Sequence, residues 1–322
     1  MSAEKILITG VTASGKGRIA FEVAKELDAE IVSVDSMKVY RRMDIGTAKP
    51  SAQMRREVDY HLVDVVEPSE SFSVGAFLSR AEKVISEISA RGRPVIAVGG
   101  TALYIKALLY GLFEGPGADE QIRANLRKQA AESGFEKLYA RLKQVDAKAA
   151  SRIHNNDYKR IIRALEVYEL TGRPISSFQK QWDEQENSGD WIVIGLRRAK
   201  EEENRRVNQR VKRMIEAGLV DEVKGLLNEE RKLSPQATGA IGYAEIIDYL
   251  RGRMPLDEAI EQIKKNTRRL AKNQRTWFRS FAQINWLDIS GSDFAMPLQA
   301  QAGEEESSGD IIQQVRRVMR KC

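Results

Sequence analysis

The chain has 322 residues, of which 42% are hydrophobic and 30% charged, and its formal net charge is +6. This length exceeds the usual size of one domain, so we expect either one large domain with an insertion or two domains. A single cysteine, Cys322, excludes a disulfide framework and a thiolate metal site, and His61 and His154 are too few for a His-rich zinc centre. No apolar run is long enough for a membrane span and no signal peptide is recognisable, so we expect no membrane association and a cytoplasmic location.

The first motif is a glycine-rich loop between an apolar run at 6–9 and a helical pattern at 18–27, formed by Gly10, Val11, Thr12, Ala13, Ser14, Gly15, Lys16 and Gly17. This strand–loop–helix context is typical of a GxxxxGK phosphate-binding loop, in which backbone N–H groups, a helix N-terminus and a lysine bind the anion. A loop that hydrolyses nucleoside triphosphates ends in Ser or Thr, whose hydroxyl binds magnesium, whereas here that position is Gly17. The alternative is a glycine-rich turn that matches by chance. We expect the loop to hold a diphosphate or triphosphate.

Short apolar runs rich in β-branched residues predict strands at 6–9, 30–34, 60–66, 95–98, 191–196 and 284–289. Amphipathic segments of helical length lie between the first four, for example at 74–90. This alternation predicts an α/β fold with a parallel sheet covered on both faces, a P-loop NTPase-like core.

The pattern changes between about Gly117 and Lys180, where only helical periodicity is found. Turn-forming residues mark its entry at 115–117 and its exit at 187–189. A second helical block follows from 200 to about 281, and a polar stretch at 299–309 predicts a linker before a short helix at 310–320. We therefore expect a first core part at 1–116, a helical insertion at 117–189, the completion of the core at 190–298, and a linker with a C-terminal helix at 299–322.

Asp35 follows the second predicted strand and Thr101 follows the fourth. Ligands of open parallel sheets bind at the carboxyl ends of the strands, so both side chains are expected beside the phosphate loop. Asp35 is then either a general base or a helix cap or magnesium ligand. Thr101 either caps the next helix or turns its hydroxyl into the crevice, and the two roles are compatible.

Basic residues are concentrated in three places. Arg206, Arg210 and Arg213 share one helix face, which either faces the phosphate or is simply solvated. The segment 264–279 has seven basic residues, no acidic residue and two aromatic residues, and the segment 158–163 carries a further cluster. Basic charge with aromatic residues suits a nucleic-acid backbone and bases, although a solvated helix face remains the alternative. Together these surfaces favour a long RNA over a small metabolite.

The motifs together resemble the bacterial tRNA dimethylallyltransferases, also called tRNA isopentenyltransferases. The resemblance rests on residues 10–16, 33–36, 43–50, 99–104, 152–167, 241–243 and 268–279, which occur in the family's order. It implies a P-loop core with a helical insertion and a tRNA anticodon loop bound between them. It implies transfer of a dimethylallyl group from dimethylallyl diphosphate to the exocyclic N6 amine of the adenosine at position 37, next to the anticodon, in tRNAs that read codons beginning with U. A diphosphate leaving group needs a cradle but no activated water, which agrees with Gly17.

The resemblance also implies roles for individual residues. Asp35 is similar to the base that accepts the amine proton. Thr101 is similar to a residue that binds the diphosphate or orients the amine. Arg210, with Arg206 beside it, is similar to the arginine that stabilises the departing diphosphate. Residues 12–17 resemble the diphosphate holder, with Ser14 and Lys16 as side-chain ligands. Segments that match tRNA contacts comprise Asp35, Ser36, Met37, Lys38, Thr101, Arg123, Lys159, Arg160, Ile161, Ile162 and Arg163. The adenine is expected to flip out of its stack.

Three positions depart from the family pattern: Gly17 replaces Thr or Ser, Val11 replaces Pro, and Lys38 replaces a frequent Gln. With Gly17, Mg2+ would be held mainly by diphosphate oxygens, water and other residues, and Lys38 adds a possible phosphate or base contact. We expect a monomer that uses Mg2+. The competing interpretations are a small-molecule P-loop kinase, which would be expected to carry Ser or Thr at position 17, and a non-catalytic RNA-binding protein, which would need neither Asp35 nor Arg210.

Overall fold

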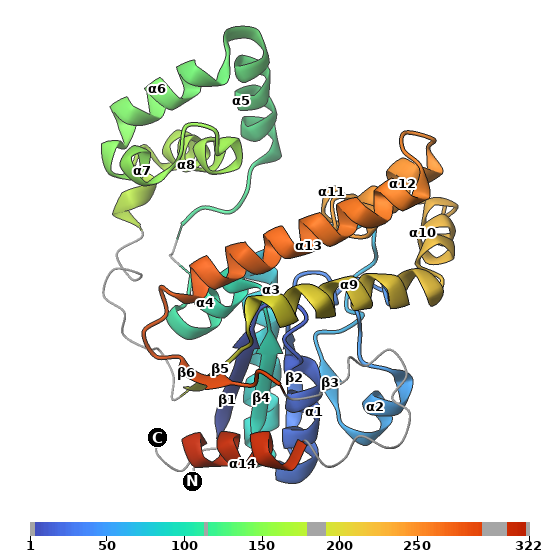
Figure 1. Cartoon of the computed structure of the whole chain (residues 1–322). Helices are drawn as coiled ribbons and strands as arrows, with labels where there is room; N and C mark the ends of the chain where they lie inside the picture. Colours follow the sequence, from blue (N-terminus) through green and yellow to red (C-terminus); the bar gives the residue numbers. More distant parts are fainter. Residues whose placement is uncertain (1–3, 113–114, 179–190, 292–307, 320–322) are drawn as a thin grey trace. The chain divides into compact units, whose positions relative to one another are not determined.

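A computed structural model describes residues 4–112, 115–178, 191–291 and 308–319 (Figure 1). The chain divides into two compact units. The core unit comprises Met1–Leu109 and Gly189–Cys322, and the helical unit comprises Tyr110–Ser188. The expected exit of the insertion at 187–189 and most of the expected linker at 299–309 lie outside the described residues.

The core unit contains a six-stranded parallel sheet, and its order is β3-β2-β4-β1-β5-β6. The strands are β1 (Lys5–Gly10), β2 (Glu30–Val34), β3 (Tyr60–His61), β4 (Val95–Gly99), β5 (Trp191–Arg197) and β6 (Asn285–Asp288). The central strands are almost entirely buried, which explains their continuous apolar runs. The predicted α/β fold with a parallel sheet is confirmed.

The third strand is much shorter than predicted. Only Tyr60 and His61 pair with β2, and Val66 forms one isolated bridge with Tyr40. Leu62 and Asp64 adopt left-handed backbone conformations, with φ of 59° and 57°. A residue with positive φ cannot continue an extended strand, so the apolar run at 60–66 turns instead.

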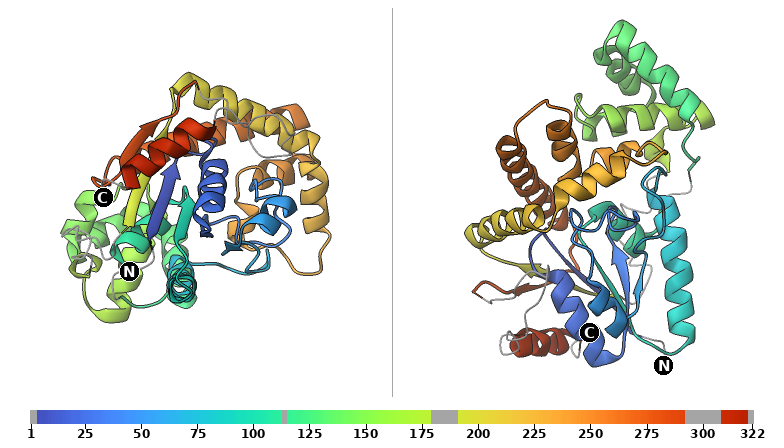
Figure 2. Two further views of the ribbon diagram at one scale, coloured as in Figure 1. Left: turned by 90° about the horizontal axis from the view of Figure 1, so that it is seen from below. Right: turned by 90° about the vertical axis from the view of Figure 1, so that its right-hand side faces the viewer.

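Helices cover both faces of the sheet, as Figure 2 shows. On one face α1 (Lys16–Leu27) packs on β1, β2 and β4, and the C-terminal helix α14 (Ser308–Met319) packs against α1. Val315 of α14 is fully buried in the cluster that includes Ile8 and Ile31. On the other face α3 (Val74–Ala90) buries its apolar stripe against β2 and β4. Further helices of the first part are α2 (Ala52–Glu57) and α4 (Ala102–Tyr110).

A second helical layer lies across the carboxyl ends of the strands (Figure 1). Its members are α9 (Lys200–Glu216), α10 (Leu219–Leu227), α11 (Pro235–Thr238), α12 (Tyr243–Leu250) and α13 (Leu256–Phe278). The long helix α13 contacts both α9 and α12, and it also reaches β1. None of the helices in the described residues combines the length and apolar character that a membrane crossing needs.

The helical unit has its own core. It contains α5 (Glu120–Ser133), α6 (Phe135–Val145), α7 (Ala147–Arg152), α8 (Tyr158–Thr171) and the 3-10 turn η1 (Ile175–Ser177). Leu126, Leu142 and Leu165 are fully buried in it. Fully buried Glu166 accepts hydrogen bonds from Arg123, Arg163 and the Asp119 backbone N–H, and so joins α5 to α8.

Two close approaches position the strand ends that form the site. At the end of β4, a Cβ added to Gly99 would lie 1.9 Å from the carbonyl oxygen of Val34 in β2. At the end of β1, a Cβ added to Gly10 would lie 2.7 Å from the carbonyl oxygen of Leu196 in β5. Only glycine lets the backbones approach so closely at these two positions.

We expect Gly99→Ala to destabilise the protein by on the order of 3 kcal/mol, because its methyl group would force β2 and β4 apart. Chemical denaturation measures the loss. Gly75→Ala is the matched control, since a Cβ there meets nothing closer than 3.8 Å, and its stability should be unchanged or slightly higher. Equal stability of the two variants would contradict this account of the sheet.

Candidate active site

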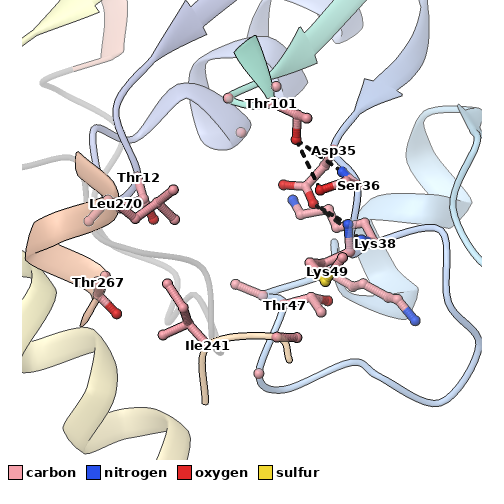
Figure 3. A pocket seen from close by; sticks show the side chains of 18 of the residues that line it. Thr12, Asp35, Ser36, Lys38, Thr47, Lys49, Thr101, Ile241, Thr267 and Leu270 are labelled. Carbon is pink, nitrogen blue, oxygen red and sulfur yellow. Dashed lines mark hydrogen bonds between the residues drawn. The ribbon is translucent and has the colours of Figure 1, made fainter. Parts of the chain in front are cut away.

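A cavity of about 580 Å3 opens at the carboxyl ends of β1, β2 and β4 (Figure 3). Its walls come from the phosphate loop, the turn at 35–38, a loop at 46–50, the residues 98–103, and the faces of α9 and α13. All of these segments belong to the core unit. The cavity therefore lies where the sequence predicts ligand binding for a parallel sheet.

The phosphate loop lines one side of this cavity with Thr12, Ala13, Gly15, Lys16 and Gly17. Gly15 adopts φ of 98° and caps α1, which directs the helix N-terminus at the cavity. The other loop residues, Gly10, Val11 and Ser14, do not line the cavity, and Val11 is 4% exposed while Ser14 is fully buried. Lys16 is thus the predicted side-chain ligand that reaches the cavity, and a ligand role for Ser14 stays a prediction.

Asp35 and Thr101 meet across the turn that follows β2. Asp35 Oδ1 accepts hydrogen bonds from the backbone N–H groups of Met37 at 2.8 Å and Lys38 at 3.2 Å. Thr101 Oγ1 accepts one from the Ser36 N–H at 3.0 Å and donates to Ser36 Oγ at 3.4 Å. The other carboxylate oxygen of Asp35 has no hydrogen-bond donor among the described residues. These bonds fix the carboxylate while leaving one oxygen to accept a proton (Figure 3).

Positive charge is concentrated around Asp35. Lys16, Lys38 and Arg210 line the same cavity. Burial, followed by the charge of Lys38, lowers the pKa of Lys16 to about 7, against the opposing effect of Asp35. Burial likewise lowers the pKa of Lys38 and that of Arg210. Because the empty site disfavours the charged forms of these side chains, an anionic ligand that stabilises the charged forms is well suited to it.

Two arginines of α9 contact the phosphate loop, as one face of that helix predicts. Arg210 Nη1 donates to Thr12 Oγ1 at 3.1 Å, and Arg206 Nε donates to the Ala13 carbonyl oxygen at 3.0 Å. Of these two, Arg210 lines the cavity. Arg206 contacts the loop backbone without lining the cavity.

Gln274 is a site residue that the sequence analysis missed. Its side-chain Oε1 accepts from the Thr12 backbone N–H at 2.7 Å, and its Nε2 donates to the Gly100 carbonyl oxygen at 2.8 Å. One carboxamide of α13 therefore ties the phosphate loop to the end of β4. The signal in the sequence was weak: a polar residue at a buried position of a helix that otherwise looked like an RNA-binding surface.

The loop at 43–50, which we call the wall loop, is held by a single carboxylate. Glu222 of α10 accepts from the backbone N–H groups of Asp44, Ile45 and Gly46 at 2.9, 2.8 and 3.2 Å, and from the Tyr243 hydroxyl at 2.6 Å. Inside the loop, buried Lys49 pairs with Asp44 and Asp64 at 2.5 Å each. A Cβ added to Gly46 would lie 2.4 Å from the Tyr243 ring, so glycine is required there.

The remaining walls are largely apolar. They include Met37, Leu103, Met214, Ile241, Leu270 and Trp277. A cavity that joins a cationic end to an apolar wall fits a ligand that is itself an anion joined to a hydrocarbon group.

A metal ion held by protein side chains alone does not fit this site. Asp35 is the one carboxylate among the cavity-lining residues, and three cations surround it. Gly17 offers no side chain, although a Cβ there would meet nothing within 4 Å. Across the described residues, no group of three or more His, Cys, Asp or Glu side chains is placed to hold a metal ion.

The predicted RNA contacts of the helical unit fall into two groups. Lys159 and Arg160 are exposed on α8. Ile161 and Ile162 are buried in the core of the unit, because the helix turns them inward, so their side chains offer no surface for RNA. Arg123 and Arg163 are ion-paired with Glu166, which makes them at least partly structural. In the core unit, α13 exposes Lys265, Arg269 and Lys272, and Arg279 is exposed directly after its end.

Known proteins resemble this chain in both sequence and structure. The model of the IPP transferase family matches residues 38–281. The tRNA dimethylallyltransferase of Geobacter metallireducens is 48% identical over 89% of this chain and 93% of its own length. One from Pelotomaculum thermopropionicum is 46% identical over 88% and 90%.

Solved structures give the same result. The tRNA isopentenylpyrophosphate transferase of Bacillus halodurans superposes with a TM-score of 0.70 at 38% identity, covering 99% of this chain and 97% of its own. A eukaryotic dimethylallyltransferase acting on tRNA gives 0.73 at 28% identity, over 90% and 75%. The chain belongs to the IPP transferase family.

Proposed function

We propose that this protein transfers a dimethylallyl group from dimethylallyl diphosphate to the exocyclic N6 amine of the adenosine at position 37, next to the anticodon of tRNA. The observation that carries the proposal is the placement, in one cavity, of Asp35 with an unoccupied carboxylate oxygen, a phosphate loop with Lys16, and an apolar wall. The names of its relatives, tRNA dimethylallyltransferase and tRNA isopentenylpyrophosphate transferase, support the same reaction.

The reaction forms one bond to carbon and breaks another, and it moves one proton. The N6 nitrogen attacks the first carbon of the dimethylallyl group, and the carbon–oxygen bond to the diphosphate breaks. The diphosphate leaves with the bonding electrons, and the amine proton passes to the Asp35 carboxylate. No water or terminal phosphate takes part, which agrees with a loop that ends in Gly17.

Developing charge on the leaving diphosphate is stabilised by Lys16, Arg210 and the N–H groups at the start of α1. Thr101 and Ser36 hold the Asp35 turn, so they orient the base relative to the amine. The apolar wall receives the hydrocarbon group and excludes water from the reacting carbon.

The RNA substrate is supported by the exposed basic residues of α13 and α8. The target adenine must leave its stack to reach the cavity, so we propose base flipping in the anticodon loop. We propose that one chain, without a partner copy, is sufficient for this.

We propose that Mg2+ arrives as part of the substrate, bound to diphosphate oxygens and water. Transfer should therefore fall in excess EDTA and recover when Mg2+ is restored, since the metal withdraws charge from the leaving group. Initial rates measured in both conditions test this. Full activity in excess chelator would refute it.

The function itself is tested by incubating the protein with radiolabelled dimethylallyl diphosphate, Mg2+ and unmodified tRNA, and by measuring ATP consumption in parallel. Label should enter the tRNA and ATP should persist. ATP consumption without labelling would instead favour a kinase. Tight tRNA binding with neither activity would favour a non-catalytic RNA-binding protein.

Asp35→Asn should lower the transfer rate by about 10^2- to 10^4-fold, because an amide cannot accept the proton. The Asn side-chain oxygen can still accept from Met37 and Lys38, so the turn should survive. Filter binding should accordingly show tRNA affinity close to that of the wild type. Turnover within tenfold of the wild type would remove Asp35 as the base.

The lowered pKa of Lys16 predicts a pH dependence of substrate binding. Near pH 7 about half of the free protein carries neutral Lys16, and an anion that binds there raises the pKa again. Binding above pH 7 must therefore take up a proton, and affinity for dimethylallyl diphosphate should fall by up to about tenfold per pH unit. Isothermal titration calorimetry measures this. Lys16→Arg stays charged throughout, so an equal fall in this variant would assign the effect to Lys38, whose pKa is also lowered, or to the ligand.

A further inference from the structure

Lys38 belongs to the turn after β2, and Figure 3 labels it on the cavity wall. It lines the same cavity as Lys16 and Arg210, on a different segment from either. The charges that shift the pKa of Lys16 are those of Lys38, Asp35 and Arg210, so the two lysines act on each other within one cavity. The turn thus adds a second lysine to the cavity that the phosphate loop lines.

The charges of this cluster are not balanced within the protein. Lys16 Nζ donates to the Val11 carbonyl oxygen and Arg210 to the Thr12 hydroxyl, and in the described part of the chain none of the three cations forms an ion pair. Three positive groups and one negative group, Asp35, leave a net charge of +2 when Lys16 is protonated.

The other basic residues on the cavity wall do form ion pairs. Arg18 pairs with Glu22, and Lys49 pairs with Asp44 and Asp64. Three cations that share one carboxylate, Asp35, destabilise the empty site through their excess positive charge, and a bound polyanion removes that cost.

The loop also lacks the hydroxyl at position 17 through which a phosphate loop usually holds magnesium. A diphosphate ester bound without a protein-held metal needs positive charge from another source. The cluster of Lys16, Lys38 and Arg210 offers it within the same cavity.

We propose that Lys38 is a further diphosphate-binding residue, and that it supplies with Lys16 and Arg210 the charge that a magnesium-holding loop obtains from its metal. The inference deepens the proposed function and relies on it for the identity of the diphosphate ester. Its consequence is that diphosphate binds to this protein without a divalent metal, even though transfer is faster with Mg2+.

The test measures binding of inorganic diphosphate by calorimetry in EDTA at about pH 6, below the pKa of about 7 that Lys16 has in the wild type. Wild type should bind, and Lys38→Gln should bind about 10- to 100-fold more weakly, the range for loss of one charge-assisted hydrogen bond. Lys38→Arg should stay within about fivefold of the wild type, since it keeps the charge. Lys83→Gln, the same charge change at an exposed site of α3, should have no effect.

Adding Mg2+ provides the second readout. The deficit of Lys38→Gln should shrink, because the metal then supplies the charge that the lysine did. A deficit that is equal in Mg2+ and EDTA would show a contact unrelated to metal replacement and would overturn the proposal. So would wild-type binding that is absent in EDTA, or a variant that loses tRNA affinity while its diphosphate affinity is unchanged.

Inorganic diphosphate binding does not depend on transfer. If the protein binds diphosphate as expected but leaves tRNA unlabelled, the proposed function is contradicted and the role of Lys38 in diphosphate binding is supported. If the protein labels tRNA but Lys38→Gln binds diphosphate as well as the wild type, the proposed function is supported and the role of Lys38 is contradicted.

Discussion

The parallel pairing of β2, β4 and β1 is the constraint on which the site depends. Val34 pairs with Gly99, and Gly99 pairs with Thr9, so three strands end side by side. The segments that continue from them, the Asp35 turn, Thr101 and the phosphate loop, therefore meet without any long connection. Glycine at 99 makes this possible, because any side chain there would collide with β2. The pairing register of these three strands therefore places the Asp35 carboxylate, the Thr101 hydroxyl and the phosphate loop next to one another.

This geometry explains how much the sequence could predict. Asp35, Thr101 and Lys16 follow apolar runs directly, and the rule that parallel strands bind ligands at their carboxyl ends was enough to place them together. Gln274 and Glu222 escaped prediction because each bonds residues more than 170 positions away, and no local pattern records such a contact. Leu62 carries no turn signal, and Asp64 is a single turn-forming residue within an apolar run, so the pattern favoured a longer β3. Ile161 and Ile162 were grouped with their basic neighbours, although helical periodicity turns them inward.

Hydrogen bonds from the second helical layer then fix the geometry of the cavity. Gln274 joins α13 to the phosphate loop and to Gly100, and Arg210 joins α9 to Thr12. The same helices supply much of the apolar wall. Charged and apolar functions are thus placed on one rigid frame, which keeps the anionic and hydrocarbon parts of a ligand at a set separation. Burial disfavours the charged forms of the unpaired cations near Asp35, and the Asp35 carboxylate offsets part of that cost.

The contact between Gly46 and the Tyr243 ring has a consequence for how the family can diversify. The two residues lie on segments almost 200 positions apart, yet they share one small volume and one carboxylate, Glu222. A larger residue at 46 can be accommodated only if 243 becomes smaller, and loss of the tyrosine hydroxyl removes one of the four donors of Glu222. The three positions should therefore covary among related chains, and engineering that reshapes the wall loop will succeed by changing them as a set.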